Sequence, residues 1–340
     1  MAGEQYLHPA PDYRLVVAGQ DITARVNPRL ISLTLTEGRE GAADSLELRL
    51  SDHDGHLAMP AKGATITLQL GWQGRALLDK GTFKVDEVEH SGAPDELHIT
   101  ARSADVTQDA RQRTDKSWHD TTLGTVLGDV ATRMGVVPRI DAQLAALAVE
   151  HVDQTNESDV HFLSRLARQH DAVATIKQGK LLFLPINATK TSTGKTLAAV
   201  HITRSSGDRH RYHSSEREAY TAVRAYWSDT GQARRKGAVA GSGKNEKRLK
   251  DTYGSQEDAL AAAKAELQRV ERGLATFEID LALGQPQITP QTPVTVAGFK
   301  PEIDGTGWLV KTATHTLAES GLITRLEMER GGSTAEEEQD

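Results

Sequence analysis

Cysteine is missing from the 340 residues of this sequence. Its absence excludes disulfide bonds, thiolate nucleophiles and cysteine-based zinc or iron–sulfur sites. The fold must therefore be stabilised by packing or by association with other chains. A hydrophobic fraction of 38% is ordinary for a soluble protein, and a chain of this length can form two or three domains with cores of their own.

Long apolar segments are missing as well. No run of residues approaches the roughly eighteen that a membrane-spanning helix needs. The N-terminus reads MAGEQYLHPAPDYR and has neither the basic nor the apolar region of a secretory signal. We therefore expect no membrane insertion, and synthesis in the cytosol, where the protein stays until it assembles.

Aromatic residues and catalytic motifs are also sparse. Aromatic side chains make up 4% of the chain and are scattered, which disfavours the aromatic platform of a carbohydrate-binding β module. Residues 193–196 end like a phosphate-binding loop, but Thr189 stands where that motif requires glycine, so we interpret the segment as a linker. His201, His210 and His213 lie near Asp208 and Glu216. Their spacing matches no metal motif, and the neighbouring arginines would repel a cation.

Two acidic stretches likewise favour structural explanations. Asp52 and Asp54 begin like a calcium loop, but the later ligands are missing, which indicates a polar turn. Asp86, Glu87 and Glu89 alternate with apolar residues along a predicted strand, as solvent-facing residues do, rather than forming a glycosidase pair. The sequence thus predicts no catalytic residues, no cofactor and no metal site.

Charge is unevenly distributed along the chain. The formal net charge of −7 argues against general affinity for nucleic acids. The C-terminus ends in AEEEQD, and we predict residues 331–340 to be a disordered acidic tail. Residues 204–250 are instead rich in arginine and lysine. Because glycines interrupt this region, and Tyr226 and Trp227 precede its basic residues rather than alternate with them, we predict a solvated, flexible loop rather than a nucleic-acid site.

The first hundred residues read as short strands. Partial apolar alternation marks residues 13–17, 31–36, 45–50, 65–72, 81–90 and 96–103, separated by glycine, proline and aspartate turns. The alternation is clearest where Ile66, Leu68 and Leu70 share one face. We predict a first β-barrel domain over residues 1–104.

Residues 105–190 show a different pattern, from which we predict a small αβ domain. Apolar residues recur at helical spacing over 121–135 and again over 157–170, a helix for which Asn156 is the predicted N-cap. Residues 172–185 read as two strands joined by a turn at Gln178 and Gly179, so we expect a hairpin beside the second helix.

Residues 191–330 return to short strands separated by proline and glycine. One long helix is expected over 255–273, because Ser255 is a suitable cap and alanine and leucine form an apolar stripe along it. We predict a second β-barrel domain that contains this helix.

Three stretches of the sequence resemble one protein family. They are the run ESDVHFLSRLARQHDA followed by KQGKLLFLP, the order Ser117-Trp118 and Thr122-Leu123 before a helix that ends at glycine, and a series of glycine, proline and tryptophan positions from Tyr253 to Thr324. Their pattern is similar to the phage late control D family, the baseplate hub protein of contractile tails. The resemblance covers most of residues 100–330 and, more weakly, 10–100. A looser similarity extends to type VI secretion spike proteins.

The resemblance implies a fold and an assembly. The implied fold class is α+β, mainly β, with two tail-tube-like β-barrel domains flanking a small αβ domain. Three chains would form a homotrimeric ring of six barrels around a channel, joining a hexameric tail tube to a trimeric spike. Implied partners are therefore further copies of the chain, the tail tube protein, the spike protein, the tape measure protein and other baseplate proteins, while nucleic acid only passes through the channel.

The resemblance also implies a virion location, in the tail baseplate, after synthesis in the host bacterial cytoplasm. A hub of a headless contractile particle or of a secretion system stays open as an alternative, and a baseplate-associated cell-wall hydrolase is the alternative from another class. Within the hub interpretation, the basic stretch from Arg234 to Lys250 is the expected partner contact. Its cationic residues are Arg234, Arg235, Lys236, Lys244, Lys247, Arg248 and Lys250.

Overall fold

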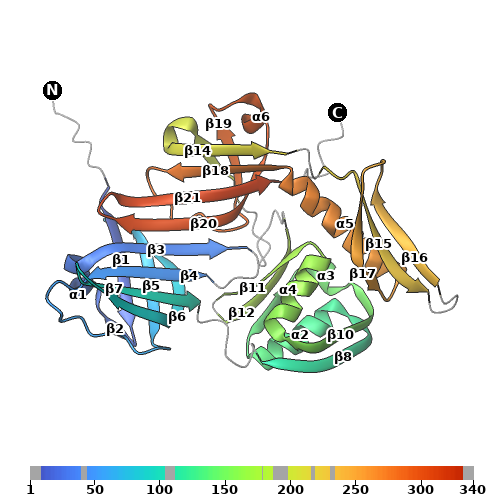
Figure 1. Ribbon diagram of the computed structural model, residues 1–340, viewed down its shortest axis with the longest axis horizontal. Coiled ribbons are helices and arrows are strands. Elements are labelled where there is room, and N and C mark those ends of the chain that lie inside the picture. The colour runs from blue at the N-terminus through green and yellow to red at the C-terminus, as the bar shows by residue number, and fades with distance from the viewer. Residues whose placement is uncertain are drawn as a thin grey trace.

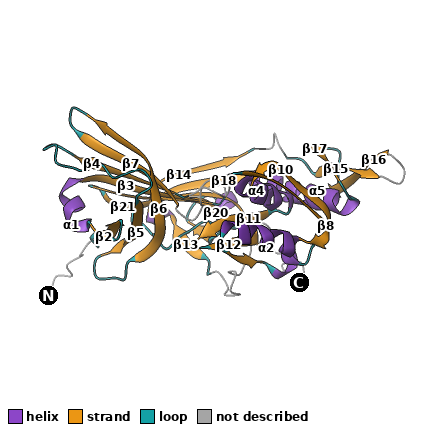
Figure 2. Ribbon diagram, turned by 90° about the horizontal axis from the view of Figure 1, so that it is seen from below, coloured by secondary structure: helices purple, strands orange, loops and turns teal. Residues whose placement is uncertain are grey.

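The computed structural model describes residues 9–39, 44–103, 112–177, 179–186, 198–215, 219–229 and 234–331. Strands dominate this part of the chain, which confirms an α+β fold that is mainly β. The molecule is elongated, and Figure 2 shows that the three long helices gather toward one end while strands fill the other. No helix in the described ranges is long and apolar enough to cross a bilayer.

Thirteen strands form the largest sheet, and they come from both ends of the chain (Figure 1). We call its first part the N-terminal β module and its second part the C-terminal β module. The N-terminal β module contains β1 (Pro11–Val17), β2 (Gln20–Asp21), β3 (Leu30–Gly38), β4 (Ser45–Ser51), β5 (Thr65–Trp72), β6 (Leu78–Ser91) and β7 (Glu96–Ser103), with the short helix α1 (Thr23–Val26). The C-terminal β module contains β13 (Val200–Thr203), β14 (Gly207–Ser214), β18 (Ala275–Leu281), β19 (Pro293–Ala297), β20 (Trp308–Ala318) and β21 (Gly321–Arg330), with α6 (Pro301–Asp304).

The two β modules are joined edge to edge by strands β3 and β20. These strands pair antiparallel from Thr312 opposite Gly38 to Ala318 opposite Ser32. The predicted closed barrels are not found, because the described pairings give an open order that runs from β14 to β2. A strand has two edges, and those of β3 are occupied by β4 and β20, so β3 cannot also close the N-terminal module onto β1.

Each β module keeps a core of its own. In the N-terminal module, alternate residues such as Leu33 and Leu35 are fully buried, as the alternation along the strands predicts. Leu317 and Leu322, from the β20–β21 hairpin, complete this core. The C-terminal core is separate and centres on Phe277 and Trp308. The sheet is therefore continuous although its hydrophobic cores are two.

The middle of the chain forms a compact unit, which we call the αβ unit. It contains β8 (Arg113–Thr122), α2 (Leu123–Met134), β9 (Val137–Ile140), α3 (Ala142–Ala145), β10 (Ala148–Ser158), α4 (Asp159–Gln169), β11 (Ala172–Lys177) and β12 (Lys180–Pro185). The expected helices and hairpin are present, but the N-cap of α4 is Ser158 and not Asn156. Ser158 accepts a hydrogen bond from the backbone of His161, whereas Asn156 has a φ of +48° and lies in the irregular part of β10.

The predicted long helix, α5 (Gln256–Gly273), packs on a small sheet of its own. This sheet has the order β16 (Arg234–Gly241), β15 (Ala222–Asp229), β17 (Glu246–Tyr253), and Val223, Ala225, Ala259 and Ala263 are fully buried between sheet and helix. We call these three strands and α5 the distal unit. The flexible loop expected over residues 204–250 is therefore wrong, because most of that stretch forms the strands β14, β15, β16 and β17.

Close packing of the backbone explains why this stretch contains glycines. Residues 242–245 cross the start of β15, and Ser242 donates a backbone hydrogen bond to Thr221. Gly241 has a φ of +78°, and a Cβ there would lie 2.4 Å from the carbonyl oxygen of Thr221. Only glycine fits such a crossing. The glycines thus permit a tight connection and do not mark a flexible segment.

Candidate functional site

A buried cluster of charges holds the four parts of the molecule together. The guanidinium of Arg272, on α5, donates two hydrogen bonds to the carboxylate of Asp171, of 2.5 and 2.6 Å, and one of 2.8 Å to Glu329. Arg39, which follows β3, lies 2.7 Å from the same Glu329 oxygen. All four side chains are buried. The cluster therefore links the distal unit, the αβ unit and both β modules.

The charges of this cluster compensate one another. Burial by itself would lower the pKa of Arg272, but the carboxylates of Asp171 and Glu329 outweigh it and raise the pKa. Arg272 is therefore a permanent buried cation. Removing one partner of such a cluster leaves an uncompensated buried charge, which is far more costly than losing an exposed ion pair.

A second buried cluster surrounds Glu37, near the end of β3. Its carboxylate contacts the amine of Lys80, lies 3.3 Å from Nε2 of His315 and lies 3.5 Å from the amine of Lys177. Lys177, at the end of β11, also lies 3.1 Å from Asp44. Lys177 thus ties the αβ unit to the N-terminal β module, and His315 brings in the C-terminal module.

Glu37 is ionised despite its burial. Burial by itself raises the pKa of Glu37. The hydrogen bond with His315 and the charges of Lys80 and Lys177 outweigh burial, and they lower the pKa from 4.5 to about 2. Burial lowers the pKa of His315, so its imidazole is neutral at pH 7. Neither cluster was identified in the sequence, although Glu37 continues the inward alternation of Leu33 and Leu35. A carboxylate at a core-facing position of a strand could have indicated a buried ion pair.

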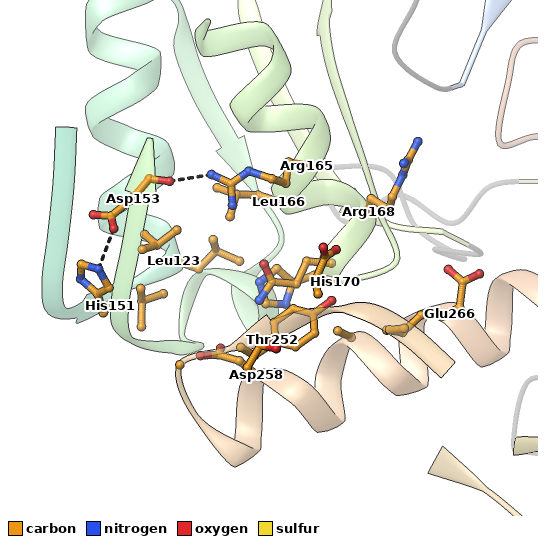
Figure 3. Close-up of a pocket in the computed structure, with 18 of the residues that line it drawn as sticks. Leu123, His151, Asp153, Arg165, Leu166, Arg168, His170, Thr252, Asp258 and Glu266 are labelled. Atoms are coloured by element: carbon orange, nitrogen blue, oxygen red, sulfur yellow. Dashed lines mark hydrogen bonds and ion pairs between the residues drawn. The ribbon is translucent and has the colours of Figure 1, made fainter. Parts of the chain in front are cut away.

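A cleft lies between the αβ unit and the distal unit (Figure 3). Its volume is about 430 Å³, and β10, α4, β17 and α5 contribute to its walls. Figure 3 shows Leu123 and Leu166 on the αβ side and Thr252 and Asp258 on the distal side. Burial lowers the pKa of His170 to about 4, so its imidazole is neutral in the cleft at pH 7.

Three carboxylates of the cleft are already engaged by protein groups. Asp153 lies 2.8 Å from His151, and Glu266 accepts a hydrogen bond of 2.7 Å from Lys247. Asp258 accepts one of 2.9 Å from Ser255. Among the residues that the structure describes, no group of three or more histidine and acidic residues is arranged to hold a metal ion.

The other sequence candidates are dispersed. Asp54 pairs with Arg29, and Asp52 accepts a hydrogen bond from the backbone of Leu57, as in a polar turn. Asp86 is exposed and pairs with Arg102. Residues 187–197, which include the linker expected at 193–196, and Glu216 lie outside the described residues.

The remaining histidine candidates do not form a cluster either. His201 lies 3.1 Å from the hydroxyl of Thr295, whereas the ring of His210 contacts those of Phe277 and Phe299 in the C-terminal core. No described contact brings His201 and His210 together with His213.

The basic residues predicted as a partner contact are divided between the faces of the small sheet. Lys247 reaches Glu266 on the helix-covered face, and Lys236 lies over Trp227 on that same face. Arg235 and Arg248 lie on the opposite face. The others are Arg234 on the helix-covered face, Lys244 in the crossing turn and Lys250 at the cleft. The expected contact is thus not one continuous patch.

Comparison with known families identifies the family to which this chain belongs. The model of the family described as phage tail baseplate hub (GPD) matches residues 43–321. This chain belongs to the phage tail baseplate hub family.

Relatives of the hub chain support that assignment over nearly the whole length. The probable baseplate hub protein of Escherichia phage 186 is 40% identical over 361 aligned residues, covering 94% of this chain and 93% of the relative. The probable baseplate hub protein of Escherichia phage P2 is 39% identical over 359 residues, with the same coverage. The expected resemblance to late control D is therefore confirmed.

Solved structures share the fold of the hub chain at low sequence identity. The 43 kDa tail protein of prophage MuSo2 from Shewanella oneidensis has a TM-score of 0.70 at 16% identity, and the alignment covers 94% of this chain and 98% of that one. A component of the type VI secretion system of E. coli has a TM-score of 0.52 at 13% identity, covering 97% of this chain and 76% of that one. The expected likeness to secretion spike proteins is thus confirmed for the fold.

Proposed function

We propose that this hub protein assembles as a homotrimer around a channel and joins a hexameric tail tube to a trimeric spike. Each chain contributes its two β modules, which together act as tail-tube-like segments, so that three chains supply a pseudo-six-fold ring. Such a ring offers six similar positions on one side and three-fold symmetry on the other.

The observation that carries this proposal is the pairing of β3 with β20. It places two β modules with separate cores side by side in one sheet, so one chain already contains two neighbours of a ring. The described sheet ends at β14, at β2 and, on a branch from β20 through β19, at β13. Open sheet edges favour uncontrolled association, and closing a ring of chains would cover them.

The polar face of the sheet supports a passage through the ring. At the β3–β20 junction, Thr36 lies beside Thr314 and Thr34 beside Thr316, on the face opposite the buried leucines. Short hydroxyl side chains present no large apolar area to which a moving chain could adhere. We propose that this face lines the channel that surrounds the tape measure protein and through which nucleic acid passes.

We propose a mechanical function without catalysis, and the same features support it. The buried charges around Arg272 and Glu37 form ion pairs that link the parts of the chain. Three carboxylates of the cleft are bound by other side chains of the protein. The affinity for tube, spike and other baseplate proteins would then come from large mixed interfaces.

Light scattering on the purified chain, with and without the spike protein of the same particle, tests the proposal. With the spike present, we expect hub mass equal to three times the 36.9 kDa of one chain. A single hub chain bound per spike, or a mass that never exceeds one chain under conditions in which particles assemble, contradicts the trimer.

A further inference from the structure

The outer face of the distal sheet concentrates arginine and tyrosine. Side chains alternate along strands, and the strand register therefore places residues from all three strands on the face opposite α5. We call this surface the arginine face. It comprises Arg224, Tyr226, Arg235, Val239, Glu246 and Arg248.

The arginines of this face are held in fixed positions. Arg224 donates two hydrogen bonds of 2.8 Å to the carboxylate of Glu246, which also accepts one of 3.1 Å from Arg248. The guanidinium carbon of Arg235 lies 4.0 Å from the ring centre of Tyr226. Such contacts reduce the conformational entropy that the side chains lose when a partner binds.

Gly237 makes room for this arrangement. A Cβ at position 237 would lie 2.9 Å from Nη1 of Arg224, so the glycine allows the arginine side chain to lie across β16. Gly237 thus has a steric function, as Gly241 does. Arg235 and Arg248 are exposed, and Arg224 is half-buried.

The composition of the arginine face matches that of protein interfaces. Arginine and tyrosine are enriched at the energetically dominant positions of such interfaces. Val239 adds an apolar side chain that is 39% exposed, next to Arg224 on the neighbouring strand. In addition, β16 is one of the two outer strands of the described three-stranded sheet, so the surface continues to a sheet edge.

The charge of the surface indicates the chemistry of its partner. The arginine face carries three arginines and one carboxylate, Glu246, and is therefore basic, whereas the chain as a whole has a net charge of −7. A basic region on an otherwise acidic protein is attracted to an acidic surface. We propose that the arginine face is the docking surface for an acidic patch on a different protein of the baseplate.

This inference rests on the proposed hub function and names the kind of partner for one of its surfaces. A nucleic acid is disfavoured, because the carboxylate of Glu246 and the side chain of Val239 interrupt the arginines, so the face does not present the continuous run of cations that a phosphate backbone needs. Val239 and the ring of Tyr226 also offer apolar area that a protein surface can cover.

A matched pair of charge reversals tests the proposal. Arg235→Glu alters the arginine face, whereas Lys244→Glu makes the same change of charge in the crossing turn, outside the strands that form that face. Each variant is supplied to producer cells that lack the hub gene, and the purified variant is also titrated onto hub-free baseplate subassemblies from those cells. The thermal unfolding temperature and the mass with spike are measured for both variants, so that folding and trimer formation are known.

We expect Arg235→Glu to weaken binding to the subassemblies by roughly 10-fold or more, as for a central interface arginine, while Lys244→Glu stays within about 3-fold of the wild type. Equal binding by both variants and the wild type overturns the inference but leaves the trimeric hub intact. Loss of the trimer mass in the wild type itself would instead contradict the proposed function.

Selection for suppressors of Arg235→Glu identifies the partner. We expect compensating changes from Asp or Glu to Lys or Arg in the gene of another baseplate protein. Compensating changes confined to the hub gene overturn the proposal, because they indicate a contact between copies. Binding of a single-stranded 20-nucleotide DNA that Arg235→Glu abolishes, with particle assembly unchanged, overturns it as well and indicates a nucleic-acid surface.

Discussion

Arginine has opposite environments in two regions of this hub protein. At the junction of the four parts, Arg272 is 3% exposed and its guanidinium makes three hydrogen bonds to carboxylates. On the arginine face, Arg248 has a side chain that is 71% exposed and one carboxylate neighbour. The comparison teaches that the buried arginine stabilises the chain itself, whereas the exposed ones are available to a partner.

The largest expected effect is at the junction. Arg272→Met leaves Asp171 and Glu329 as buried charges without their shared cation, and we expect a loss of about 3–5 kcal/mol in the free energy of unfolding. Urea denaturation of the purified variant measures it. The matched control is Arg325→Met, which removes a half-exposed pair with Glu278 and should cost less than about 1 kcal/mol. Equal losses for the two variants would remove the distinction between buried and exposed arginine.

The second prediction concerns acid stability through Glu37. Its pKa is lowered from 4.5 to about 2 in the folded protein, so the folded state binds fewer protons than the unfolded state between these values. Its contribution, roughly 3 kcal/mol at most, is present above about pH 4.5 and lost as the pH falls toward 2.

Unfolding measured between pH 6 and pH 2 tests this contribution. Glu37→Gln should be less stable than the wild type at pH 6, and the difference should shrink on acidification. A constant difference across the range would mean that the charge of Glu37 does not stabilise the fold. Asp86→Gln is a suitable control, because Asp86 forms an exposed pair with Arg102.

The third and smallest effect is expected in the crossing turn of the distal unit. Gly241→Ala adds a Cβ that meets the Thr221 carbonyl at a positive φ, and we expect a destabilisation of about 1–3 kcal/mol. Gly254→Ala is the control, because no atom lies within 4 Å of the added carbon. If both variants unfold at the wild-type urea concentration, the segment is a flexible connection after all.

Local features of the fold could be predicted from the sequence because neighbouring residues specify them. The hairpin over 172–185 was predicted with the same outer bounds, since Gly179 supplies the turn with a φ of +69°. Helix α5 begins after Ser255 as its capping pattern indicates. The N-cap of α4 was misplaced by two residues, because both Asn156 and Ser158 have capping side chains and only the fold of β10 decides between them.

Long-range pairing could not be predicted in the same way. Apolar alternation predicts that β3 and β20 are strands. No feature of either segment indicates that the two strands pair with each other. This pairing is the reason that the predicted closed barrels are not found. Strands β16 and β17 of the distal unit were missed for another reason. Their glycines and cations resemble those of a loop. Gly241 and Gly237 are needed because a larger residue would collide with Thr221 and Arg224, which lie earlier in the chain.

Electron cryo-microscopy of the assembled particle tests the central claim most directly. We expect three copies of this chain around the tail axis, with six β modules surrounding the channel and the β3–β20 junction of each copy facing it. One copy or six copies per baseplate, or β modules that lie away from the axis, would contradict the account.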